Sequence, residues 1–87
     1  VCLNNASSTL ARIRANGVLS VNVLSDAQRE VAEIFAGGRG LEGEARFRPK
    51  DGWSMAGLAP VLPDALSSFD CRVTDLSAVG SHVVVFG

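Results

Sequence analysis

Both ends of the chain have the composition of buried β-strands, and this constrains the fold more than any other feature. The sequence begins with Val1-Cys2-Leu3 and ends with the apolar run 83–86 followed by Gly87. The ends of natural domains are usually polar and exposed. We therefore expect an internal piece of a longer protein, whose strand edges need pairing from other segments.

Length, charge and composition limit the classes of protein to which the chain can belong. The 87 residues carry a formal net charge of −1, and a chain of this length forms a single small domain, residues 1–87. A dedicated nucleic-acid binder needs a strong basic excess, and a membrane span needs about 20 consecutive apolar residues. The sequence has neither feature, so we expect no nucleic-acid partner and no membrane partner.

Cysteine and histidine are too few for a zinc site. Cys2 and Cys71 lie far apart, and His82 is the single histidine, whereas zinc takes about four ligands at characteristic spacings. We expect no metal. Free cysteines usually behave as small buried hydrophobes, so the sequence predicts two buried free thiols and a reducing, cytoplasmic location.

A helix and a strand are predicted in the first third of the chain. Ser7 or Ser8 can cap a helix over 9–16, where apolar residues recur three apart. Gly17 is a typical helix stop. The segment 18–24 then alternates apolar and polar residues with a period of two, which predicts a strand.

A second helix is predicted after Ser25, which forms a capping box with Gln28. Glycines at positions 37 and 38 end it. The stretch 37–52 is rich in glycine and charge, which is typical of a lid or a mobile loop. The alternative is a loop that Phe47 and Trp53 pin to the body of the protein.

The last part of the chain predicts a β-hairpin. Residues 65–76 alternate as a half-exposed antiparallel strand, 78–80 form a turn with a glycine, and 81–86 return as an apolar strand. With the two helices, this predicts an α+β fold that is mainly antiparallel β.

Few motifs in the sequence predict a catalytic or binding activity from their spacing alone. The sequence has no GxSxG elbow, no GxGxxG and no P-loop. The segment 37–40 resembles a phosphate loop, but it follows a helix and therefore lacks the helix N-terminus that such a loop needs. His82 is either a proton donor or cofactor contact, or an ordinary strand-end residue.

The stretch between the first strand and the first helix is a better anion site. It consists of Asn4, Asn5, Ala6, Ser7, Ser8 and Thr9. The first turn of a helix exposes unpaired amides and the positive end of its dipole, and these side chains add further polar groups. The stretch therefore suits a phosphate or the polar edge of a heterocycle, and an ordinary capped helix is the alternative.

Several motifs together resemble a known family. They are Val1-Cys2-Leu3-Asn4-Asn5-Ala6-Ser7-Ser8-Thr9, Gly17 to Leu24, Glu33-Ile34-Phe35-Ala36-Gly37, the segment 47–53, Pro60-Val61-Leu62, Phe69-Asp70-Cys71-Arg72-Val73 and Gly80-Ser81-His82. In this order, the chain resembles the flavin reductase-like family over essentially its whole length. These are short-chain NAD(P)H:flavin oxidoreductases that serve two-component monooxygenases.

The resemblance implies a split β-barrel that binds FMN or FAD, uses NADH or NADPH as co-substrate and forms a homodimer. It implies hydride transfer from the nicotinamide to flavin N5, with reduced flavin passing to a partner oxygenase. A non-catalytic flavin-binding or dimerisation module on the same fold, or an inactive fragment, is the alternative.

The resemblance also implies three groups of site residues. It places the isoalloxazine edge and the flavin phosphate at Asn4 to Thr9. It places the cofactor tail near Phe35, Ala36 and Gly37, and the nicotinamide near His82.

Two departures from the family pattern matter. Ser81 stands where the family usually has an acidic residue, so no carboxylate at this position orients the imidazole of His82. The family also carries strands before the segment that matches Val1 and continues beyond Gly87. The resemblance therefore implies a barrel that is incomplete within these residues.

Overall fold

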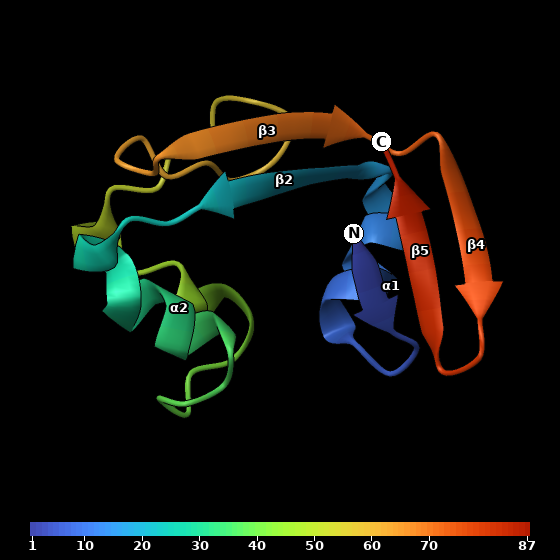
Figure 1. Ribbon diagram of the computed structural model, residues 1–87. Helices are drawn as coiled ribbons and strands as arrows, with labels where there is room; N and C mark the ends of the chain where they lie inside the picture. Colours follow the sequence, from blue (N-terminus) through green and yellow to red (C-terminus); the bar gives the residue numbers. More distant parts are fainter.

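The computed structural model describes all residues, 1–87, and has the form of an arch (Figure 1). Two helices and five strands build it, with three short 3₁₀ turns at Asp26–Gln28, Gly43–Arg46 and Pro49–Asp51. The helices and strands are β1 Cys2–Asn4, α1 Ser8–Asn16, β2 Val18–Val23, α2 Arg29–Phe35, β3 Ser67–Arg72, β4 Asp75–Val79 and β5 His82–Phe86. Strands β2 and β3 span the top of the arch, with α2 on one side and α1, β1, β4 and β5 on the other.

Both sheets are antiparallel. One has the strand order β1-β5-β4, and the other is the pair β2-β3. The predicted α+β class with antiparallel strands is confirmed. The two sheets do not close into a barrel within the 87 residues.

Helix α1 begins and ends as predicted. The Ser7 hydroxyl accepts a hydrogen bond from the Leu10 amide at 3.3 Å, which satisfies one of the unpaired amides of the first turn. Gly17 ends the helix at φ 70°, a conformation that costs glycine little because it has no Cβ. The helix buries Leu10 and Ile13 against the three-stranded sheet.

Helix α2 is shorter than predicted. The side-chain oxygen of Gln28 accepts a hydrogen bond from the Ser25 amide at 2.9 Å, as the capping box requires. The first turn after Ser25 is 3₁₀, so the α-helix proper starts at Arg29. Neither α1 nor α2 is long and apolar enough to cross a membrane.

The predicted single strand over 65–76 is wrong. The segment divides into β3 and β4, which belong to different sheets. The reason is a change of partner: the Val73 amide donates to the Gly17 carbonyl at 2.9 Å, and the Thr74 amide donates to the Phe86 carbonyl at 2.7 Å. The hairpin is therefore β4–β5, and its turn lies at Gly80 and Ser81, not at 78–80.

The arch contains two small cores, one on each side. On the side of α1, the buried cluster is Leu10, Ile13, Val83 and Val85. On the side of α2, the buried side chains are Val31, Ile34 and Leu62. Just 7 of the 87 residues are buried, so the centre of the arch holds no core.

The prediction of two buried thiols is wrong. Both cysteines are free, but Cys2 is exposed and Cys71 is half-buried. Side chains alternate across a strand, and in β1 it is Leu3 that packs against the core. Cys2 therefore points to the outer face of an edge strand.

We expect Leu62→Ala to destabilise the protein by about 2–5 kcal/mol, because it leaves a cavity in the core on the side of α2. Leu62 is 1% exposed, whereas Leu66, four residues later, is 70% exposed. The matched control Leu66→Ala should change stability by about 0.5 kcal/mol or less. Urea unfolding of the full-length protein measures both, and equal losses would contradict this view of the core.

Candidate functional site

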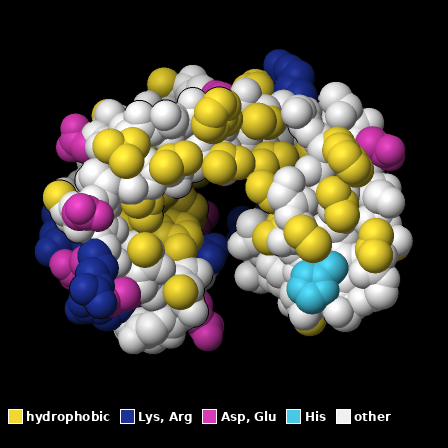
Figure 2. Space-filling view, in the orientation of Figure 1, with side chains coloured by type: hydrophobic (Ala, Val, Ile, Leu, Met, Phe, Trp, Pro, Cys, Tyr) yellow, Lys and Arg dark blue, Asp and Glu magenta, His cyan; other side chains and the backbone are white.

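A cleft of about 1480 Å³ lies under the arch, between its two sides. Hydrophobic side chains gather on the underside of the arch, around the hollow (Figure 2). The apolar lining comes mainly from β2, from the ends of α2 and from the loop after it. Concave, mostly apolar sites with a few polar groups are typical of small-molecule binding.

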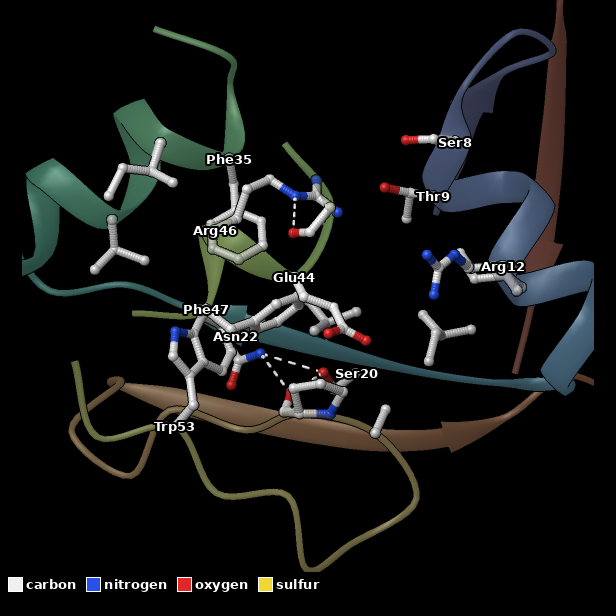
Figure 3. Close-up of a pocket in the computed structure, with 18 of the residues that line it drawn as sticks. Ser8, Thr9, Arg12, Ser20, Asn22, Phe35, Glu44, Arg46, Phe47 and Trp53 are labelled. Carbon is white, nitrogen blue, oxygen red and sulfur yellow. Dashed lines mark hydrogen bonds between the residues drawn. The ribbon is translucent and has the colours of Figure 1, made fainter. Parts of the chain in front are cut away.

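One wall of the cleft is the first half of α1. Ser8, Thr9 and Arg12 line it, and Figure 3 shows all three side chains pointing across the gap. Residues four apart share a helix face, so Ser8 and Arg12 lie on the same side. Arg12 forms no ion pair in the structure, which leaves its charge free for an anion.

The opposite wall is an aromatic cluster made of Phe35, Phe47 and Trp53. The ring centroids lie 4.9 to 5.4 Å apart, in edge and tilted contacts. The Arg46 guanidinium lies 5.0 Å from the centroid of the Phe35 ring, a cation–π distance. The Trp53 Nε1 donor is buried without a hydrogen-bond partner. The predicted pinning of the loop by Phe47 and Trp53 is confirmed.

The floor of the cleft is polar at one point, around Asn22. Its Oδ1 accepts hydrogen bonds from the Leu62 amide at 3.0 Å and the Ser68 hydroxyl at 2.9 Å. Its Nδ2 donates to the Ser20 hydroxyl at 3.3 Å and to the Pro60 carbonyl at 3.4 Å. The Ser20 hydroxyl also donates to the Pro60 carbonyl. Asn22 thus ties β2, β3 and the segment 60–62 together beneath the cleft.

The loop after α2 is held by ion pairs as well as by aromatic contacts. Arg48 donates two hydrogen bonds to the Asp51 carboxylate, both at 2.8 Å, and one to Glu30 on α2 at 2.6 Å. The hydrogen bond from Arg48 lowers the pKa of the Glu30 carboxyl and that of Asp51 below their ordinary values. The same contacts raise the pKa of Arg48.

The glycine-rich segment 37–40 makes its contacts with α2. The Gly38 amide is occupied by the Glu33 carbonyl at 2.8 Å. Arg39 donates to the Glu33 carboxylate at 2.9 and 3.1 Å and lies 3.7 Å from Glu30. The segment closes the end of α2, as its position after a helix predicted.

Four of the predicted cofactor residues line the cleft and five do not. Ser8, Thr9, Phe35 and Gly37 line the cleft, on opposite walls, and Ala36 does not. Asn4 ends β1, and Asn5, Ala6 and Ser7 form the turn between β1 and α1; all four lie outside the cleft lining.

The polar groups of that turn serve mainly local structure. The Asn4 side chain accepts from the Ala6 amide at 2.8 Å. The Asn5 amide donates to the Ser81 carbonyl at 2.9 Å, and its side chain donates to the Gly80 carbonyl at 3.3 Å. The turn therefore contacts the β4–β5 turn.

His82 lies at the start of β5, exposed and outside the cleft lining. It pairs with Asn4 in the β1–β5 register. The Ser81 hydroxyl lies 2.9 Å from its Nδ1 atom and is a hydrogen-bond partner in place of a carboxylate. The fold thus brings His82 next to the predicted turn 4–7, although the two are far apart in sequence.

Several cleft residues were not predicted as site residues, among them Arg12, Ser20, Asn22, Glu44, Arg46, Phe47 and Trp53. Arg12 was recognisable as one turn after Ser8 on the same helix face. Ser20 and Asn22 were visible as polar positions of an alternating strand, which a half-buried sheet normally turns to solvent. Glu44 had no signal, because its position depends on how the loop folds back.

All of residues 1–87 match the flavin reductase like domain family. The chain belongs to this family. The resemblance seen in the sequence is thereby confirmed, and the cleft of this flavin reductase-like domain is its candidate cofactor site.

Curated relatives carry matching names. The chain is 45% identical over 86 residues to "FMN reductase (NADH) RutF 1" of Methylorubrum extorquens, covering 99% of the chain and 42% of the relative. It is 42% identical to "FMN reductase (NADH) RutF" of Acinetobacter baylyi, covering 99% of the chain and 45% of the relative. The chain thus spans less than half the length of these relatives.

Solved structures share the fold. Flavin reductase PheA2 superposes with a TM-score of 0.81 at 25% identity, covering 98% of the chain and 52% of that protein. BorF, the flavin reductase component of a bacterial two-component tryptophan halogenase, superposes with a TM-score of 0.82 at 26% identity, covering 98% and 54%.

Acid should release the loop after α2 by protonating Glu30 and Asp51. The pKa values of both carboxyls are lowered in the folded state. Their ion pairs therefore contribute fully to stability above about pH 4, the pKa of such carboxyls in the unfolded chain, and this contribution is lost as the pH falls through the lower pKa values of the folded state. Arg48, Lys50 and Arg39 are the positive groups that these carboxylates face.

The single tryptophan, Trp53, reports this release. Its fluorescence quenching by iodide should rise below about pH 4. The double variant Glu30→Gln, Asp51→Asn has no carboxylates to protonate, so its Trp53 should be accessible already at neutral pH and show no acid step. An identical step in both proteins would refute the assignment.

We expect Asn22→Ala to destabilise the protein by about 1–3 kcal/mol, because it leaves the Leu62 amide, beside a buried side chain, without an acceptor. Ser68→Ala removes just one exposed donor from the same network and should cost less. Urea unfolding compares the two. A smaller loss for Asn22→Ala than for Ser68→Ala would contradict the role of Asn22 in the floor.

Proposed function

We propose that this chain forms the flavin-binding half of an NAD(P)H:flavin oxidoreductase that reduces FMN or FAD. The observation that carries the proposal is the cleft, with an aromatic wall facing a helix N-terminus and two arginines free of ion pairs, in a chain of this family. The names of the relatives, FMN reductase (NADH), support FMN and NADH as the first choice.

The residues of the cleft fit the two chemical parts of a flavin. A planar heteroaromatic ring needs apolar walls, which β2 and the aromatic cluster provide. A phosphate suits the first turn of α1, where the Ser8 and Thr9 hydroxyls and the Arg12 guanidinium face the gap. Arg46, on the other wall, offers a second guanidinium.

The flavin, when bound, supplies the atom that accepts the hydride, N5. The residues of this chain bind and orient the rings, and no side chain needs to act as a nucleophile. The apolar underside of β2 excludes water from one face of the site. Residues 4–7 and His82 lie together at one end of β1 and β5, outside the cleft lining, and we assign them to the nicotinamide side of the site and not to the ring inside the cleft.

The arginines of the loop favour NADH over NADPH. The loop carries four basic residues that a 2′-phosphate could contact, Arg39, Arg46, Arg48 and Lys50. Arg39 and Arg48 are held by acidic partners, which leaves fewer free cations for that phosphate. Lys50 forms no ion pair, but it lies near the Arg48 contacts and outside the cleft.

The assembly is part of the same proposal. We assign the chain to an incomplete split β-barrel, completed by segments outside these residues, because the relatives are about twice as long. Exposed apolar side chains at Leu66, Phe69, Val79 and Phe86 support a homodimer. A partner oxygenase fits another similar solved structure, nitrilotriacetate monooxygenase component B of Mycobacterium thermoresistibile, and two free thiols fit a cytoplasmic location.

The proposal is tested by titrating the full-length protein with FMN and FAD and then measuring NADH oxidation. We expect saturable binding of FMN and NADH consumption that depends on FMN. Binding without NADH consumption would favour the non-catalytic flavin-binding module, and absence of binding would refute the flavin site.

Substitutions locate the site. Arg12→Ala and Arg46→Ala should each weaken FMN binding by roughly tenfold, the scale of one lost charged contact. Arg14→Ala removes an exposed arginine of the same helix that does not line the cleft, and it should bind FMN like the unsubstituted protein. Equal weakening by all three variants would show a general charge effect instead of a site.

A further inference from the structure

We propose that Arg48 is a positioning residue for the flavin site. It acts by clamping the segment 43–53 to α2, so that Arg46 and Phe47 are held in the wall of the cleft. This inference rests on the proposed function, because it assigns that wall to the flavin. Arg48 itself does not line the cleft.

The contacts of Arg48 join the 3₁₀ turn Pro49–Asp51 to α2. Its guanidinium binds Asp51, in the 3₁₀ turn after it, through two parallel hydrogen bonds at 2.8 Å. It binds Glu30, in the first turn of α2, at 2.6 Å. The Arg48 side chain is 19% exposed and that of Asp51 10%, so the pair is largely shielded from solvent. The bidentate contact with Asp51 is therefore stronger than an exposed ion pair and orients the guanidinium toward Glu30. Glu30, whose side chain is 43% exposed, accepts one charged hydrogen bond and links Arg48 to α2.

Arg46 and Phe47 lie in the cleft wall just before Arg48, and each has only turn or aromatic contacts of its own. Arg46 donates a hydrogen bond to the Gly43 carbonyl at 3.0 Å, within its own turn, and otherwise contacts aromatic rings. Phe47 packs on Phe35 and Trp53. The contacts with Phe35 join Phe47 and Trp53 to the end of α2, and the ion pair from Arg48 to Glu30 adds a charged attachment near the start of the same helix.

The chemistry of this clamp requires arginine. The planar guanidinium bonds Asp51 with two nitrogens while Glu30 is also bound. Lysine carries the same charge on a single nitrogen and cannot reproduce the paired contact. The other ion pairs near α2, such as Arg29 with Glu33 at 3.7 Å, lie on an exposed face and do not reach the segment 43–53.

The test uses the full-length protein and the variants Arg48→Met, Arg48→Lys and Arg29→Ala. Steady-state NADH oxidation at varied FMN separates KM from kcat, and iodide quenching of Trp53 reports whether the segment leaves α2. For Arg48→Met we expect a rise in the KM for FMN of roughly tenfold, with kcat within about twofold, because binding and not the hydride step depends on the wall. Arg48→Lys should recover part of this loss, and Arg29→Ala should match the unsubstituted protein.

Three results would overturn the proposal. One is an unchanged KM in Arg48→Met, even if Trp53 becomes accessible, because the clamp would then not serve the site. Another is a fall in kcat that follows loss of folded protein in thermal unfolding, which would make Arg48 merely structural. If instead the unsubstituted protein does not oxidise NADH with FMN, the proposed function fails first, and the positioning role fails with it.

Discussion

The antiparallel pairing of β2 with β3 is the interaction on which the rest of the structure depends. Six consecutive residue pairs, from Val18 opposite Arg72 to Val23 opposite Ser67, form one two-stranded ribbon. The ribbon spans the top of the arch and links two small cores that do not touch one another (Figure 1). An isolated two-stranded ribbon is marginally stable in water. The contacts that β2 and β3 make with other segments are therefore as important for its stability as the backbone hydrogen bonds between the two strands.

Those side contacts are polar where they face the cleft. Asn22 uses both ends of its amide to join β2 to β3 and to the segment 60–62. A half-buried polar network of this kind is favourable when every member is satisfied. On the far side, Arg48 and the aromatic cluster hold the loop after α2 in place. The cleft is therefore shaped by a few directional contacts instead of by a continuous core.

Local signals in the sequence were reliable where neighbouring residues decide the structure. Ser7 as the cap of α1, Gly17 as its end and the box between Ser25 and Gln28 depend on contacts within one turn. The division of 65–76 was not predictable in this way, since it follows from the Gly17 and Phe86 carbonyls, which are distant in sequence. For the same reason Glu44 escaped notice, because its position depends on how the loop folds back.

By itself, the sequence determined the two helices and their caps, strand β2, the antiparallel class and, through the order of its motifs, the flavin reductase-like family. These depend on side-chain periodicity and on hydrogen bonds between near neighbours. Only the tertiary structure decided that His82 lies beside Asn4 and that Arg12 faces Arg46 across a cleft. Strand registers and loop folding bring such groups together, and both depend on contacts between residues many positions apart in the chain.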